Sequence, residues 1–186
     1  MSKHFNVVII GAGTGGIMTA AQIKNQKRDA SIAIIDPAET HYYQPAWTLV
    51  GAGAYDYKKT GRPMSSVIPN GCHWVKDAVT TIDADNNKVN TASSGELSYD
   101  ILVAAPGIQI DVDGIPGLKE GLEAGVVCSN YTDPEKTWEL VQKFKGGNAI
   151  FTQPATPIKC GGAPQKIAYL AADYVRKNGL ATKTYL

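Results

Sequence analysis

An α/β fold built on a parallel sheet is predicted by three features near the amino end of the chain. Residues 7–10 are four apolar residues in a row, which is typical of a buried strand. A glycine-rich turn at residues 11–16 follows and opens a helical segment at about residues 15–25. A second apolar run, residues 31–35, ends at Asp36, 20 residues beyond the turn. This succession predicts a Rossmann-like dinucleotide-binding fold.

Each glycine of the GxGxxG pattern has a physical role in such a fold. Gly11 permits a tight turn, Gly13 lets the backbone approach a pyrophosphate, and Gly16 lets the helix pack closely on the strand. The amide end of the helix would face the phosphates, because its unpaired N–H groups and its dipole favour an anion. Asp36 is suited to accept hydrogen bonds from both hydroxyls of an unmodified ribose. The alternative interpretation is a glycine-rich turn in an ordinary α/β protein.

Composition narrows the class of protein further. The chain has 186 residues, 44% of them hydrophobic, and a formal charge of +1, which argues against a nucleic-acid partner. No apolar run reaches the length of a membrane span, and no signal peptide precedes the first strand, so the expected setting is a reducing cytoplasm. Three widely spaced cysteines, Cys72, Cys128 and Cys160, form neither a disulfide scaffold nor a CxxC zinc site, and no metal site is predicted.

The segments after Asp36 are less regular. Residues 41–47 are rich in aromatic side chains, which either wall a flat ring system or pack as an ordinary loop. Residues 51–63 are polar and contain glycine, so they are interpreted as an exposed loop. Apolar runs farther along predict strands at residues 73–75, 78–83 and 88–91, and a buried strand in the segment 97–107 that ends in a small-residue turn. Because no helix separates these strands, they are expected to form a small antiparallel excursion from the parallel sheet.

Residues 111–125 have a loop-like composition and mark a soft boundary. We therefore predict a dinucleotide-binding domain at residues 1–115 and the start of a second dinucleotide-binding-type domain at residues 116–186. In the second part, Thr132 is expected to cap a helix that ends near Lys145.

A further strand is predicted at residues 148–152 and a helix at residues 163–178, with Gly179 as its C-terminal cap. The turn between them, residues 153–162, lacks GxGxxG, contains two prolines and carries Cys160. A nicotinamide dinucleotide is therefore not expected there.

The chain resembles the flavoprotein disulfide reductases and, within them, the sulfide:quinone oxidoreductases. The resemblance is carried by the glycine turn and by four segments, residues 41–53, 99–107, 129–138 and 156–166. It implies FAD in the first site, with Ala78 and Val79 at the adenine and Gly107 in a turn against the cofactor. The full set of cofactor-binding residues predicted on this basis is Gly11, Gly13, Thr14, Gly15, Gly16, Asp36, Pro45, Ala78, Val79, Ala105 and Gly107.

The resemblance also implies a reaction. In this family sulfide attacks a bridge between two cysteines, one cysteine keeps the sulfane sulfur, and the other passes two electrons to the flavin, which a quinone reoxidises. Cys160 matches the flavin-side cysteine. The adjacent Lys159 and the amide end of the next helix are both expected to lower the pKa of its thiol. The alternative is a buried, inert cysteine; Cys128 and Cys72 are interpreted as structural or spectator thiols.

The family's catalytic chain is about twice as long as this one. The second redox cysteine and the amphipathic membrane-docking helices would lie beyond Leu186, so we expect a truncated chain that does not oxidise sulfide alone and that forms a homodimer through exposed strand edges. The full-length form would lie at the membrane surface, with sulfide, a quinone and a sulfane-sulfur acceptor as partners. The alternatives are a type II NADH:quinone oxidoreductase, or a non-catalytic flavin-binding redox module.

Overall fold

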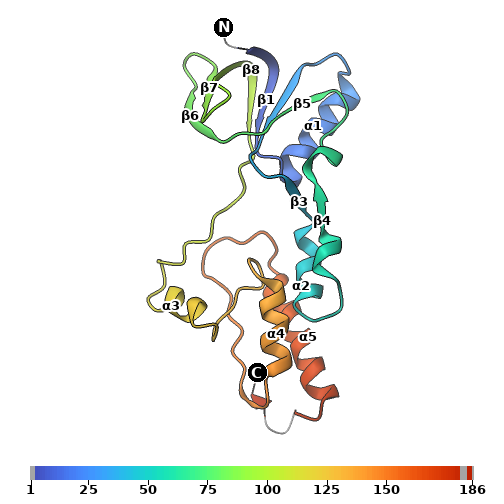
Figure 1. Cartoon of the computed structure of the whole chain (residues 1–186), viewed down its shortest axis with the longest axis vertical. Helices are drawn as coiled ribbons and strands as arrows, with labels where there is room; N and C mark the ends of the chain where they lie inside the picture. The colour runs from blue at the N-terminus through green and yellow to red at the C-terminus, as the bar shows by residue number, and fades with distance from the viewer. Residues whose placement is uncertain (1–2, 181–183, 186) are drawn as a thin grey trace. The chain divides into compact units, whose positions relative to one another are not determined.

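The computed structural model describes residues 3–180 and 184–185, and the chain forms two compact units (Figure 1). The first unit consists of Met1–Tyr42 with Arg62–Ile110. The second consists of Tyr43–Gly61 with Asp111–Leu186, so a segment from the amino-terminal half packs with the carboxyl-terminal part of the chain. The predicted division into functional domains near residue 115 stays a prediction.

The first unit is built on a six-stranded sheet with the order β5-β2-β1-β8-β7-β6. β1 pairs in parallel with β2 and β8, and β2 pairs in parallel with β5. β7 is antiparallel to both β6 and β8. The predicted α/β class, with a parallel sheet and a small antiparallel extension, is confirmed. The strands are β1 (Lys3–Ile10), β2 (Ile32–Ile35), β5 (Cys72–Val75), β6 (Val79–Asp83), β7 (Lys88–Thr91) and β8 (Glu96–Ala104).

The antiparallel part is smaller than expected. β5 pairs in parallel with β2, because the long connection after β2 lets the chain cross back and run in the same direction. The chain reverses direction between β7 and β8, so β8 is antiparallel to β7 and parallel to β1. Within the six-stranded sheet, only the β6–β7–β8 meander is antiparallel.

Apolar residues on both faces of the sheet explain why it is stable. On one face, Val7, Ile9 and Ile34 pack against α1 (Thr14–Gln26), whose Ala20 is fully buried. On the other face, Val8, Ala33 and Ile35 pack with the apolar side chains of β7 and β8. Burial on both faces is what the continuous apolar runs in β1 and β2 indicate.

Between β2 and β5 the chain forms short elements. They are β3 (Thr40–Tyr42), a 3₁₀ turn (Gln44–Ala46), α2 (Trp47–Val50), a 3₁₀ turn (Tyr57–Thr60), β4 (Gly61–Pro63) and a 3₁₀ turn (Met64–Ser66). β3 pairs with β4, and α2 packs against α4 and α5 in the second unit. The prediction of an exposed loop at residues 51–63 is therefore wrong in part, and Thr60 is only 2% exposed.

In the described part of the second unit, three helices follow α2, namely α3 (Leu118–Glu123), α4 (Pro134–Lys143) and α5 (Ala163–Lys177). α3 falls within the segment interpreted as a loop. The cap of α4 is Asp133, not Thr132, because the Asp133 carboxylate accepts the backbone N–H of Lys136 at 2.9 Å.

α5 is terminated as predicted by Gly179, which follows its C-cap residue Asn178. The φ of +69° at Gly179 and the bonds Gly179 N–H to Arg176 O and Leu180 N–H to Val175 O form a Schellman motif.

The strand predicted at residues 148–152 is wrong. β9 covers only Gly147–Asn148, which pairs with β10 (Thr184–Tyr185), and Ile150 is 82% exposed. A strand requires a neighbour for its backbone groups, and the described residues provide one for only two positions. The segment from residue 149 to residue 162, which carries Cys160, therefore contains neither helix nor strand.

Candidate functional site

The glycine turn lies where three parallel strands end. Ile10, Ile35 and Ala104 are aligned in the sheet register, so the residues that follow them meet at one edge. Gly11 N–H donates to Ile35 O at 2.8 Å, and Ala105 N–H donates to Ile10 O at 2.8 Å. β1 lies between β2 and β8, which makes this edge a topological switch point, the usual ligand position in α/β sheets.

Two of the glycines are required by the packing of the turn itself. Gly11 has a φ of +98°, and a Cβ there would lie 2.2 Å from Ala105 O. A Cβ on Gly16 would lie 1.9 Å from Gly11 O. Both positions therefore exclude any side chain, as the roles predicted for a tight turn and close helix packing require.

Gly13 is different, because the fold does not require a glycine there. Its φ of −69° suits any residue, and a Cβ would meet nothing within 4 Å. Gly13 is the N-cap of α1, no side chain caps this helix, and its first turn, which includes Thr14 and Gly15, contains no acid. The open space and the uncapped amides fit an anionic ligand that approaches the backbone.

Asp36 is held in place by four hydrogen bonds. Its N–H donates to Val75 O at 3.1 Å, and its carbonyl accepts the indole N–H of Trp74 at 2.9 Å. Its carboxylate oxygens accept the N–H groups of Ala12 at 2.7 Å and Ala38 at 2.8 Å. Each oxygen keeps a further lone pair, so the carboxylate can still accept ribose hydroxyls.

Sequence reasoning missed a contact of His41. Its Nδ1 lies 3.2 Å from Ala12 O in the glycine turn, and the side chain is partly buried. The aromatic cluster at residues 41–47 was the signal, but periodicity does not say which side chain reaches the turn. The indole of Trp47 is only 8% exposed, donates to Thr60 Oγ1 at 3.2 Å and packs near the rings of Tyr57 and Tyr131.

Ala78 and Val79 follow β5 at the same edge of the sheet. The N–H of Ala78 donates to the carboxylate of Asp77, and its carbonyl accepts the N–H of Ala92 at 2.9 Å. Val79 begins β6 opposite Thr91.

Gly107 has a φ of +81° and open space around its Cβ position. The structure thus brings together the predicted residues Gly11–Gly16, Asp36 and Ala105, while Pro45 and Cys160 belong to the second unit.

Asp77 anchors the chain beside Ala78. Its Oδ2 accepts the Ser93 N–H at 2.9 Å, the Ser93 hydroxyl at 2.9 Å and the Ser94 N–H at 2.6 Å. These bonds, led by the one from the Ser93 backbone, hold the pKa of Asp77 far below its ordinary value of 3.8.

We expect Asp77→Ala to lower the melting temperature at pH 7, because the N–H groups of Ala78 and Ser93 lose their acceptor and that of Ser94 keeps only Thr91 Oγ1. A depressed pKa contributes stability above the ordinary value and loses it as the pH falls toward the folded-state value. The difference from wild type should therefore shrink below about pH 4. Thermal melts between pH 7 and 2 measure this, with exposed Asp85→Ala in the same hairpin as the control. A constant difference over that range would contradict it.

Cys160 is exposed, and its carbonyl accepts the Ala163 N–H at 3.0 Å, so the residue lies just before α5. The alternative of a buried cysteine is therefore wrong. The ammonium of the adjacent Lys159 donates to Gln44 Oε1 at 2.8 Å and lies 5.0 Å from the centre of the Tyr131 ring. These contacts tie the otherwise irregular segment to residues from two other parts of the second unit.

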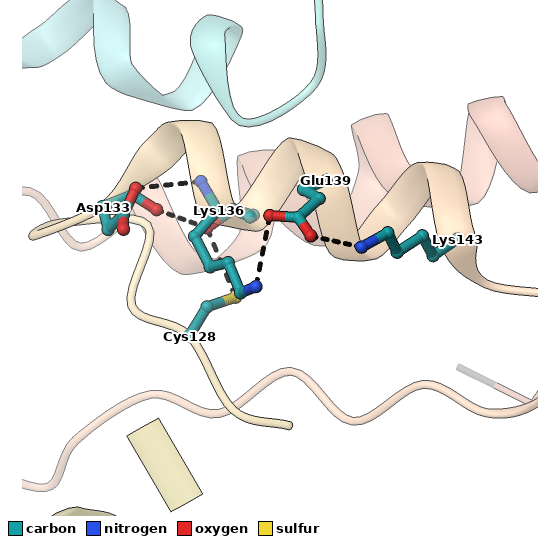
Figure 2. Close-up of polar contacts among 6 residues, drawn as sticks. Cys128, Asp133, Lys136, Glu139 and Lys143 are labelled. Atoms are coloured by element: carbon teal, nitrogen blue, oxygen red, sulfur yellow. Dashed lines mark hydrogen bonds and ion pairs between the residues drawn. The ribbon is translucent and has the colours of Figure 1, made fainter. Parts of the chain in front are cut away.

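The other two cysteines, Cys72 and Cys128, are partly buried. Figure 2 shows Cys128 beside α4, where its Sγ accepts the hydroxyl of the buried Thr137 at 3.4 Å. The same view shows the α4 surface pairs of Glu139 with Lys136 and Lys143. Burial raises the pKa of the Cys72 thiol, and Lys24 opposes this only in part.

Comparison with protein-family models gives one match that covers most of the chain. The model described as pyridine nucleotide-disulphide oxidoreductase matches residues 5–144. The chain belongs to this family. Membership implies a flavin cofactor, and the open Gly13 and uncapped α1 described above fit the phosphates of such a group.

Relatives within the pyridine nucleotide-disulphide oxidoreductase family confirm the resemblance seen in the sequence. The chain is 47% identical over 183 residues to the mitochondrial sulfide:quinone oxidoreductase of Mus musculus and 45% identical over 184 residues to that of Dictyostelium discoideum. Each match covers 97% of this chain and 41% of the relative, so the chain spans about two fifths of their length. A type II NADH:quinone oxidoreductase of Staphylococcus aureus is 32% identical over 117 residues, which is 61% of this chain and 29% of that protein.

Solved structures agree on the fold. The sulfide:quinone oxidoreductase of Aquifex aeolicus matches with a TM-score of 0.76 at 24% identity, over 98% of this chain and 42% of that one. An NAD-dependent persulfide reductase from A. fulgidus matches with a TM-score of 0.60 at 19% identity, over 97% of this chain and 39% of that one. Among the described residues, no helix combines the length and apolarity that crossing a membrane requires.

Proposed function

We propose that this chain is the FAD-binding and thiol-bearing part of a sulfide:quinone oxidoreductase. The observation that supports this most strongly is 47% identity over 97% of the chain, because so complete a match cannot omit the ten-residue turn that carries Cys160. The similarity to a type II NADH:quinone oxidoreductase covers only 61% of the chain. In addition, the turn at residues 153–162 contains prolines where a second phosphate-binding glycine pattern would be needed.

In this proposal residues 1–115 hold FAD and residues 116–186 begin the second dinucleotide-binding-type domain. The pyrophosphate is held at the amide end of α1 by Gly13, Thr14 and Gly15, and a ribose by Asp36. Ala78 and Val79 provide the adenine contact. Ala105 and Gly107 complete this part of the site, and Pro45 of the second unit stays a predicted cofactor-binding residue.

Cys160 is the proposed catalytic residue. Its exposure lets hydrosulfide reach the sulfur, and the tie from Lys159 to Gln44 and Tyr131 fixes the turn that presents it. Hydrosulfide breaks the bridge between Cys160 and a second cysteine: the second cysteine keeps the sulfane sulfur as a persulfide, and Cys160 leaves as the thiolate that carries the electron pair. A bound flavin supplies the chemistry that accepts this electron pair and returns it to a quinone. A sulfane-sulfur acceptor then removes the outer sulfur.

The test is anaerobic addition of sulfide to an FAD-loaded form that carries both cysteines of the bridge, since the chain alone is not expected to oxidise sulfide. We expect the flavin absorbance to bleach in wild type, and the rate to fall at least about a hundredfold in Cys160→Ser, since a hydroxyl cannot replace the thiolate. Mass spectrometry should find one added sulfur on the second cysteine and none on Cys160. Cys128→Ser is the matched control, because serine can accept the same hydrogen bond from Thr137, and it should bleach like wild type.

Other responses of the flavin to sulfide or NADH would indicate one of the two alternative functions. A bound flavin that ignores sulfide indicates a non-catalytic flavin-binding module, and one that NADH bleaches without sulfide indicates a type II NADH:quinone oxidoreductase. Equal bleaching in wild type and Cys160→Ser would contradict the role of this thiol. Docking at a membrane surface, where the quinone is found, and assembly as a homodimer remain parts of the proposal.

A further inference from the structure

The peptide group between Ala12 and Gly13 is fixed by a side chain outside the glycine motif. His41 Nδ1 lies 3.2 Å from Ala12 O. A carbonyl oxygen can only accept a hydrogen bond, so Nδ1 carries the proton and donates it. On the other side of the same residue, the Ala12 N–H donates to Asp36 Oδ2 at 2.7 Å. Ala12 is therefore held at both its N–H and its carbonyl.

This arrangement has a consequence for Gly13. In a planar trans peptide the C=O and N–H groups point in opposite directions. The bond that holds Ala12 O toward His41 therefore turns the Gly13 N–H away from His41. A Cβ on Gly13 would meet nothing within 4 Å, so the backbone beside this N–H is open.

We propose that His41 is a positioning residue that aims the Gly13 N–H at the pyrophosphate of the cofactor. The inference rests on the proposed FAD site and adds a residue from β3 to it. His41 is well placed for the task, because its neighbours are themselves fixed. Asp36 accepts the Ala38 N–H at 2.8 Å, and Glu39 O accepts the Met64 N–H at 2.7 Å. The imidazole thus acts through the backbone and needs no contact with the ligand.

The test compares three substitutions at His41. His41→Leu removes the donor, His41→Asn keeps an N–H group at the position of Nδ1, and His41→Gln moves the N–H group to the position of Nε2. We expect His41→Leu and His41→Gln to weaken binding of FAD and of ADP about fivefold to tenfold, the worth of one hydrogen bond. His41→Asn should stay within about twofold of wild type. Adenosine, which lacks phosphates, should bind all four proteins equally.

A second readout needs no ligand. The amide resonance of Gly13 in ¹H–¹⁵N spectra should shift in His41→Leu and return toward wild type in His41→Asn. Wild-type binding of ADP by His41→Leu, or equal weakening of adenosine and ADP, would overturn the positioning role while leaving the cofactor proposal intact. If wild type binds neither FAD nor ADP, the cofactor proposal fails and this inference fails with it.

Discussion

Gly16→Ala is expected to destabilise the first unit by about 3 kcal/mol or more, a large part of the 5–15 kcal/mol that stabilises a typical domain. The added Cβ would lie 1.9 Å from Gly11 O and 3.2 Å from the Ile9 side chain. The first contact is with backbone, which is itself fixed by the bond from Gly11 N–H to Ile35 O. Relief of the clash must therefore move α1 away from the sheet. Loss of amide protection in β1 and β2 during hydrogen exchange, together with a lower urea midpoint, would measure the effect.

The matched control for this prediction is Gly13→Ala in the same motif. Its Cβ meets nothing within 4 Å, so stability should change by no more than about 1 kcal/mol. Affinity for FAD should fall, however, because the methyl group occupies the space proposed for the pyrophosphate. Equal urea midpoints for the two variants would contradict the prediction, because they would show that the backbone of the turn can shift to accommodate the Cβ at position 16.

Trp47→Ala is expected to cost the second unit about 3–5 kcal/mol, as is usual for a buried aromatic residue. The indole is 8% exposed, donates to Thr60 and lies 5.8 Å from the Tyr57 ring. Its backbone carbonyl also accepts the side-chain N–H of Asn130 at 3.3 Å. This result would decide between the two interpretations of the aromatic segment, because a side chain that only walls a ligand can be removed with little loss of stability.

Hydrogen exchange resolved by peptide can measure the effect in each unit. Protection in α4 and α5 should fall in Trp47→Ala, while protection in β1 and β2 should stay close to wild type. Trp47→Phe should lose less, since it keeps most of the apolar contact. Tyr43→Ala, at a position that is 61% exposed, is the control from the same segment and should change stability by about 0.5 kcal/mol or less. A stable Trp47→Ala protein with weaker FAD binding would support the alternative interpretation.

The contacts predictable from sequence are those between neighbours along the chain or those fixed by a motif. The apolar run of β1, the glycine turn and the start of α1 are adjacent, so steric rules for glycine and strand burial are enough to place them. Asp36 was predicted because it ends an apolar run 20 residues beyond the glycine turn, and the parallel pairing of β1 and β2 brings the ends of both strands to one edge. The cap at Asp133 was missed by one residue, because Thr132 and Asp133 are both good caps and only the observed bond distinguishes them.

Other features depend on partners that no local pattern reveals. The apolar stretch after Asn148 forms no strand, because in the described structure the pairing with β10 ends at Asn148. Residues 43–61 follow β3 in sequence but pack with α4 and α5 through Trp47 and its neighbours. The contact of His41 with the glycine turn joins residues 29 positions apart, and no periodic pattern in the sequence predicts it.

By itself, the sequence determined the α/β class, the dinucleotide motif and the relation to sulfide:quinone oxidoreductases. All three depend on short-range patterns, because a strand, a glycine turn and a cysteine segment are each recognisable without their neighbours in space. Only the tertiary structure decided that Gly11 and Gly16 serve packing while Gly13 is left open, and that His41 and Asp36 hold Ala12 from both sides. Those distinctions depend on which distant backbone atoms approach within hydrogen-bonding or van der Waals distance, and that is set by how the whole chain packs.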